Sequence, residues 1–340
     1  MERMNREQFY AKLGPLSRED LQKVLWTLYW RGTAAVRERI EAETTPASTV
    51  TVKQRSTTTI DPQLVLLEVE QFVQLARAGS YLAGDRRVRP KERTQWRFTF
   101  KRLVTEARDA LRSDDPAAAT AVETLIDLAN DMRRHNYFRS EDAVEAAGIV
   151  VSDEVALLWA RMLERDGLTG LCATATVQLI RWESRYGWTV SGYGNVAEKE
   201  VPLATVLANL LPVPDAWTVA ADSYLDALDR CAPIRAATRQ RTSWRSDNYE
   251  LRERTESLAL WHKLLFDRFA GSDEEDRLDR LTTHPSLDGP ELVYLQARLA
   301  HHRGDINRAH KLASECLSTL PGHKGFRDFA AEIGAPPSTR

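Results

Sequence analysis

The sequence has few of the features that mark a catalytic or metal-binding protein. It contains only three cysteines, an odd number, and they lie far apart with no Cys-x-x-Cys pair: Cys172, Cys231 and Cys316. This excludes a disulfide framework and a zinc ribbon, and it is typical of a reducing compartment. Hydrolase, zinc-protease and phosphate-loop motifs are missing as well. The sequence therefore predicts no catalytic residue, no cofactor and no metal site.

Long hydrophobic runs are also missing. No stretch approaches the roughly 18–20 apolar residues of a membrane-spanning helix, and the first residues show no signal-peptide pattern. The net charge of -2 gives no overall attraction to nucleic acid or to an anionic membrane. We therefore expect a cytoplasmic protein without membrane contact. The excess of Arg over Lys is typical of a GC-rich, bacterial genome.

Helical periodicity is present along nearly the whole chain. Apolar residues recur at i, i+3 and i+4, prolines open helices and glycines end them, as at Gly167. Two of the predicted helices cover 197–211 and 247–270. Strand signals are confined to a short alternative hairpin at 188–196 or 48–60. The pattern predicts an all-α fold, a multi-helix bundle that leads into a short helical-repeat region at the C-terminus.

Breaks in this periodicity predict five segments. The Thr-rich stretch is a poor helix former because its residues are β-branched, and it is interpreted as a linker or a β-arm. The segments are an N-terminal helical hairpin at 1–43, the linker or arm at 44–61, a helical domain at 62–235, a repeat-like region at 236–334 and a tail at 335–340.

Small residues and turn residues have a characteristic spacing near the C-terminus. They are Ala297, Ala300, Gly304, Ala309, Ala313 and Pro321. Small side chains let two antiparallel helices approach closely, and glycine supplies the turn conformation. This spacing resembles the tetratricopeptide repeat. A second copy is indicated by Trp261 and Gly271, which precede Tyr294 and Gly304 by 33 positions, so the resemblance covers residues 257–333. It implies a helical surface that binds another protein.

One predicted helix is strongly basic. Residues 86–112 carry ten basic and three acidic residues, a local charge of +7. The surface candidates on this helix are Arg86, Arg89, Arg93, Arg97 and Lys101, of which the last four are four residues apart and share one face. An apolar stripe at helical spacing marks another face, which is predicted to be core: Trp96, Phe100, Leu103, Ala107 and Leu111. Three interpretations of the basic row are open. It is a solvated face, a docking surface for phosphates or an acidic partner, or a face that pairs with acidic helices such as Asp222, Asp226, Asp229 or residues 273–276.

Two aromatic residues in a glycine-rich loop are further contact candidates, namely Trp188 and Tyr193. The other tryptophans fall mostly at helical spacing with apolar residues and are predicted to be core: Trp26, Trp30, Trp96, Trp159, Trp182 and Trp261.

Three functions remain open from the sequence. The first is a cytosolic, non-enzymatic scaffold that binds another protein through helical surfaces, with a homo-oligomer left open. The first alternative is a nucleic-acid-associated protein that uses helix 86–112. The second alternative is an all-helical enzyme or nuclease with a composite site, since Arg303 and His310 resemble the Arg–His signature of HEPN ribonucleases. Gly304 between them predicts a turn, which places the pair on different helices.

Overall fold

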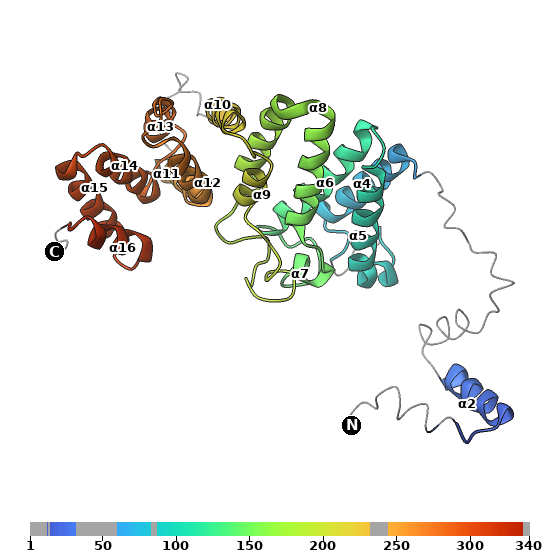
Figure 1. Cartoon of the computed structure of the whole chain (residues 1–340). Coiled ribbons are helices and arrows are strands. Elements are labelled where there is room, and N and C mark those ends of the chain that lie inside the picture. Colours follow the sequence, from blue (N-terminus) through green and yellow to red (C-terminus); the bar gives the residue numbers. More distant parts are fainter. Residues whose placement is uncertain (1–11, 13, 32–59, 83–86, 232–243, 336–340) are drawn as a thin grey trace. The chain divides into compact units, whose positions relative to one another are not determined.

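All regular structure in the described part of the chain is helical. The computed structural model describes residues 12, 14–31, 60–82, 87–231 and 244–335 (Figure 1). These residues form fourteen helices and no strand, which confirms the predicted all-α fold. The chain divides into two units, residues 1–59 and residues 60–340, and each is described by itself.

The first unit contains α2 (Arg18–Arg31). Ser17 caps it, since the Ser17 hydroxyl accepts the Asp20 N–H at 3.1 Å. Trp26 and Trp30 on this helix are 61% and 69% exposed, so the prediction that they are core residues is wrong. The described residues of this unit hold no second helix of comparable length to cover them. The rest of the predicted hairpin and nearly all of the predicted linker lie outside the described residues.

The second unit begins with three helices that each start at a proline: α4 (Pro62–Arg77), α5 (Pro90–Ala110) and α6 (Pro116–Met132). Proline suits the first helical position because its missing N–H would be unpaired there anyway. Asp61 and Asp115 cap α4 and α6 by accepting backbone N–H groups of the first turn. The three helices pack on one another, and the short helix α7 (Ala143–Ala147) covers α5 and α6.

The next element, α8 (Val151–Trp182), is a helical hairpin. Gly167 has φ 69° and ψ -176°, a conformation that only glycine adopts readily, and the helix breaks there as predicted. Figure 1 shows the two halves side by side. The indole N–H of Trp159 donates to Gln178 Oε1 at 2.6 Å and joins the halves. The Gln178 amide then donates to Glu123 of α6 at 2.8 Å, so a buried polar chain ties α8 to α6.

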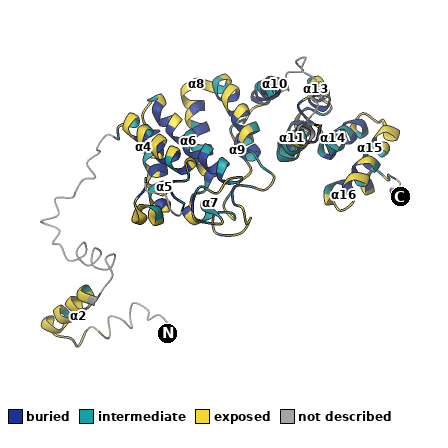
Figure 2. Ribbon diagram, turned by 180° about the vertical axis from the view of Figure 1, so that it is seen from behind, coloured by how far each residue is buried: buried dark blue, intermediate teal, exposed yellow. Residues whose placement is uncertain are grey.

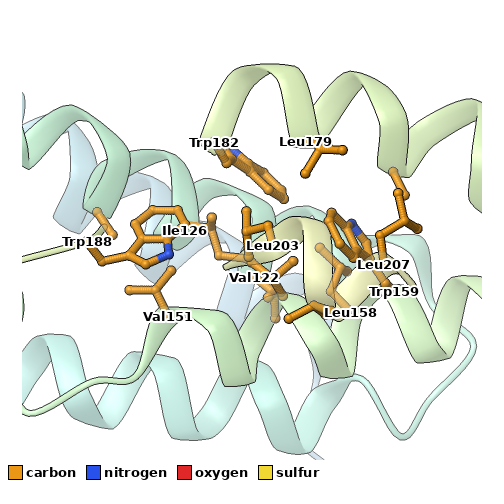
Figure 3. Packing of buried hydrophobic residues seen from close by; sticks show 14 of the residues in the cluster. Val122, Ile126, Val151, Leu158, Trp159, Leu179, Trp182, Trp188, Leu203 and Leu207 are labelled. Carbon is orange, nitrogen blue, oxygen red and sulfur yellow. The ribbon is translucent and has the colours of Figure 1, made fainter. Parts of the chain in front are cut away.

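After α8 the chain continues through α9 (Leu203–Asn209) and α10 (Pro214–Cys231). The predicted helix 197–211 is shortened to α9, because Pro202 restricts the residue before it and lacks an N–H. The predicted hairpin at 188–196 is a loop without strands. Trp159, Trp182 and Trp188 all lie in the core that α6, α8 and α9 share (Figure 3).

Six helices complete the described chain. The predicted helix 247–270 is interrupted at the buried Leu258 (φ -92°, ψ 7°) and forms two helices. The helices are α11 (Trp244–Ser257), α12 (Ala259–Phe269), α13 (Asp276–Thr282), α14 (Pro290–His302), α15 (Ile306–Thr319) and α16 (Lys324–Glu332). The helices α14 and α15 pack closely on each other as a hairpin. Buried residues face inward along these helices, and exposed residues cover their outer sides (Figure 2).

Candidate partner-binding surfaces

The inner face of α5 fixes the orientation of the helix. All five residues of the predicted apolar stripe, from Trp96 to Leu111, are buried. The Trp96 ring stacks on Phe138 with ring centroids 4.1 Å apart. Val104 and Ala110 are buried beside the stripe, and most of the other residues of α5 are exposed. The charged residues on that outer side can therefore be sorted by what they contact.

Two arginines near the C-terminal end of α5 are neutralised by carboxylates. Arg102 pairs with Glu68 of α4 at 3.0 Å and with Glu106 at 2.6 Å. Arg108 bonds to Glu154 of α8, with Nε 3.0 Å from Oε2. The Glu154 side chain is almost fully buried, and burial raises the pKa of its carboxyl while Arg108 opposes that shift. These arginines join neighbouring helices and belong to the fold.

The predicted basic row does not pair in this way. Arg89, Arg97 and Lys101 are exposed and make no ion pair with any residue in the described parts of the chain. Arg86 lies outside the described residues. The prediction that acidic helices of the chain neutralise this basic row is wrong for the ion pairs that the described residues form. Asp222 pairs with Arg277 instead, at 2.8 Å. Asp229 and residues 274–276 likewise contact α13 and its neighbours.

Arg93 departs from the predicted row. It is half-buried, and its Nη1 donates to the carbonyl of Leu82 at 3.3 Å, in the segment between α4 and α5. Its Nε is buried without a hydrogen-bond partner among the described residues. The helical row drifts by about 40° at every fourth residue, which carries Arg93 toward the core side and Lys101 toward solvent.

The outer side of α5 also carries an exposed aromatic residue that the sequence reasoning missed. Phe98 is 61% exposed, and the guanidinium carbon of Arg97 lies 4.9 Å from its ring centroid. Lys91 and Lys101 share its side of the helix, at i-7 and i+3. We call Lys91, Arg97, Phe98 and Lys101 the α5 face. The sequence does contain one signal of this exposure, because Phe98 falls outside the apolar stripe of the helix.

The two aromatic candidates in the glycine-rich loop have different environments. Tyr193 is 85% exposed, whereas Trp188 is only 4% exposed, so the prediction of Trp188 as a surface contact is wrong. Trp188 lies under the guanidinium of Arg133, which is 4.5 Å from its ring centroid. Burial lowers the pKa of Arg133 to about 10, and this side chain donates to the Trp182 carbonyl at 2.6 Å. Trp188 is therefore an anchor of the loop and part of the core.

Carboxylates hold this loop by accepting backbone N–H groups. Glu145 accepts from Val196 at 3.1 Å, and Asp142 accepts from Ser191 at 3.1 Å. A Cβ at Gly194 would lie 2.4 Å from the Glu145 carboxyl carbon, so glycine is required there for the close approach. The loop tip, including Tyr193, is thus displayed on a fixed base.

Two further carboxylates cap helices beside the loop. Glu200 accepts the N–H groups of Val151 and Ser152 at 2.7 and 2.9 Å, at the start of α8. Glu183 accepts the N–H of Ala204 at 2.8 Å, at the start of α9. Burial raises the pKa of both carboxyls, and the accepted hydrogen bonds oppose that shift.

A hollow of about 520 Å³ lies on the C-terminal helices α13, α14 and α15. Arg303 lines it and is held by Asp279 at 2.8 and 3.0 Å and by Glu275 at 2.7 Å. Arg308 also lines it and makes no ion pair with any described residue, and Arg280 makes only a 3.7 Å contact with Asp229. The sequence reasoning did not find this hollow, because its residues come from three helices.

The C-terminal histidines are dispersed among separate partners. His310 bonds to the carbonyl of Ile333 at 2.8 Å, and His302 lies edge-on to Phe266. Arg303 ends α14 and His310 lies within α15, so the two residues are on different helices. Within the described residues no group of three or more His, Cys, Asp or Glu side chains is placed to hold a metal ion.

Among the described residues, no helix combines the length and apolarity needed to cross a membrane. Comparison with protein-family models, curated proteins and solved structures finds no match for the chain.

Proposed function

We propose that the protein is a non-enzymatic, cytoplasmic binding protein that holds another protein on the surface of its C-terminal helices. The hollow on α13–α15 is the observation that carries this proposal. Its size is within the range of binding pockets. Three arginines and two aspartates line the hollow, so its lining carries a net positive charge, which suits a partner segment that presents acidic side chains.

The resemblance to a tetratricopeptide repeat supports the same proposal. Gly271 and Gly304, 33 positions apart, have φ values of 75° and 78° and form the turns after α12 and α14. The small residues Ala297, Ala309 and Ala313 are buried where α14 and α15 meet. Similar turns at a fixed spacing are what two stacked repeat units require.

The experiment is affinity capture from native lysate with the full chain and two charge-reversal variants. The hollow variant is Arg280→Glu/Arg308→Glu. The matched control is Lys311→Glu/Arg327→Glu, which changes the same charge at two exposed residues of α15 and α16 that make no ion pair in the described chain. We expect a partner that the wild-type protein and the control retain and that the hollow variant loses. A partner that all three proteins retain equally would contradict the proposed site.

A further inference from the structure

The α5 face is a group of cations that the described helices do not neutralise. Lys91, Arg97 and Lys101 are exposed and have no ion pair among the described residues. On the same helix, Arg102 and Arg108 are neutralised by carboxylates of α4 and α8. Among the described residues, carboxylates thus neutralise the cations that lie between helices and do not pair with those on the α5 face.

The segments outside the described residues carry no net negative charge. Residues 32–59 have four basic and three acidic residues, and residues 232–243 have three arginines and no acid. Residues 1–11 and 83–86 are balanced, and residues 336–340 add one arginine.

The geometry of the face is that of an extended array. Successive turns of a helix place cations about 6 Å apart along its axis, and Lys91 and Lys101 are separated by about 15 Å of helix. An array of this kind matches a linear polyanion better than a single anion. Phe98 lies within the array, between Lys91 and Lys101 along the helix, with Arg97 against its ring.

We propose that the α5 face binds single-stranded nucleic acid, with the cations on successive phosphates and the ring of Phe98 stacked on a base. A positive track with an aromatic platform is the usual means of binding a single strand without sequence preference. A duplex keeps its base faces stacked and would leave Phe98 without a role. The contacts use phosphates and a base face and no sugar hydroxyl, so RNA and DNA strands of equal length bind alike. This site is separate from the protein-binding hollow and does not depend on it.

The test measures fluorescence anisotropy of labelled oligothymidylate, oligouridylate and a mixed-sequence duplex, each of about 20 nucleotides, with the full chain. We expect saturable binding of both single strands and about tenfold weaker binding of the duplex. For three phosphate contacts at about -0.7 each, the logarithm of the association constant falls with the logarithm of salt with a slope of about -2.

Three variants assign that binding to the α5 face. Arg97→Glu/Lys101→Glu weakens binding at least about tenfold, whereas the control Lys311→Glu/Arg327→Glu, with the same change in net charge, stays within about twofold. Phe98→Ala weakens it about tenfold and Phe98→Trp restores it, because an aromatic face and not this particular side chain is needed. Thermal unfolding of each variant shows that the fold is intact, since all these positions are exposed.

Three results would overturn the proposal. One is the lack of saturable binding at low salt. Another is an equal loss of affinity in the α5 and control charge-reversal variants, which would show a non-specific effect of net charge. The third is an unchanged affinity of Phe98→Ala combined with equal competition by polyglutamate, which would show that the face takes an acidic protein and no base stacks on it. None of these results tests the hollow on α13–α15. The proposed protein-binding function is tested separately, by the capture experiment with Arg280→Glu/Arg308→Glu.

Discussion

Cations on the α5 face and arginines on the C-terminal helices differ in what neutralises them. Arg277 and Arg303 on the C-terminal side have close carboxylate partners, at 2.8 Å from Asp222 and from Asp279. Arg97 on α5 makes no ion pair with the described residues, and its guanidinium lies over the ring of its neighbour Phe98. The difference separates cations that position helices from cations that remain for a partner. Residues 86–112 carry a charge of +7 in a chain of net charge -2, so the remaining residues sum to -9.

The largest expected effect contrasts the two aromatic residues of α5. Trp96→Ala removes a buried ring stacked on Phe138 and should lower the free energy of unfolding by about 3–5 kcal/mol. Phe98→Ala, two residues away on the outer side, should change it by less than about 0.5 kcal/mol. Urea denaturation of both variants measures this. Comparable losses would show that the two faces of α5 are not distinct.

The next effect contrasts two arginines of the same helix. Arg108→Ala leaves the buried carboxylate of Glu154 without its cation and should cost about 2 kcal/mol. Arg97→Ala removes no ion pair found in the described chain and should cost less than about 0.5 kcal/mol. Chemical denaturation of the two single variants gives both values. A cost at Arg97 equal to that at Arg108 would place Arg97 among the residues that hold the fold.

A smaller effect is expected at the C-terminal arginines. Arg303→Ala removes three hydrogen bonds to Asp279 and Glu275. Because these side chains are partly exposed, the variant should lower the free energy of unfolding by only about 1 kcal/mol. Lys311→Ala, an exposed residue of α15, serves as the control and should be neutral. High salt should reduce the difference between the two variants, because exposed ion pairs are screened. A difference that grows with salt would contradict this account.

The smallest effect is a dependence of stability on pH. Burial raises the pKa of Glu154, Glu183 and Glu200 above the unfolded value. The folded protein then binds more protons than the unfolded chain between the two pKa values. Stability is therefore greatest below the unfolded pKa and falls as the pH rises through the folded one. Glu200→Gln, which keeps an acceptor oxygen but cannot ionise, should flatten this dependence in denaturation curves recorded between about pH 4.5 and pH 7.

Helix positions and the inner face of α5 could be predicted from the sequence because they depend on local periodicity. Trp96 and Phe100 follow the 3.6-residue repeat, and Gly167 ends a helix because its conformation excludes other residues. Boundaries were less accurate where a local rule was overlooked, as with Pro202 before α9. The exposed positions of Trp26 and Trp30 could not be foreseen, since periodicity marks an apolar face without showing whether anything covers it.

The candidate surfaces depended on long-range contacts that spacing does not contain. The sequence placed Arg97 and Lys101 on one face but could not show that Arg102 meets Glu68, 34 residues earlier, while Arg97 meets no carboxylate in the described chain. Trp188 was mistaken for a surface residue because a glycine-rich loop is usually exposed, whereas Arg133 and the core hold its ring. The hollow on α13–α15 could not be predicted from the sequence, because its lining residues come from three helices that meet only in the folded chain.

The most direct test of the central claim, that the cations of the α5 face serve a partner and not the fold, is one affinity ratio. It compares labelled oligothymidylate binding by Arg97→Glu/Lys101→Glu and by Lys311→Glu/Arg327→Glu under identical salt. We expect Arg97→Glu/Lys101→Glu to bind oligothymidylate at least about tenfold more weakly than the control variant. Equal affinities in the two variants would contradict it.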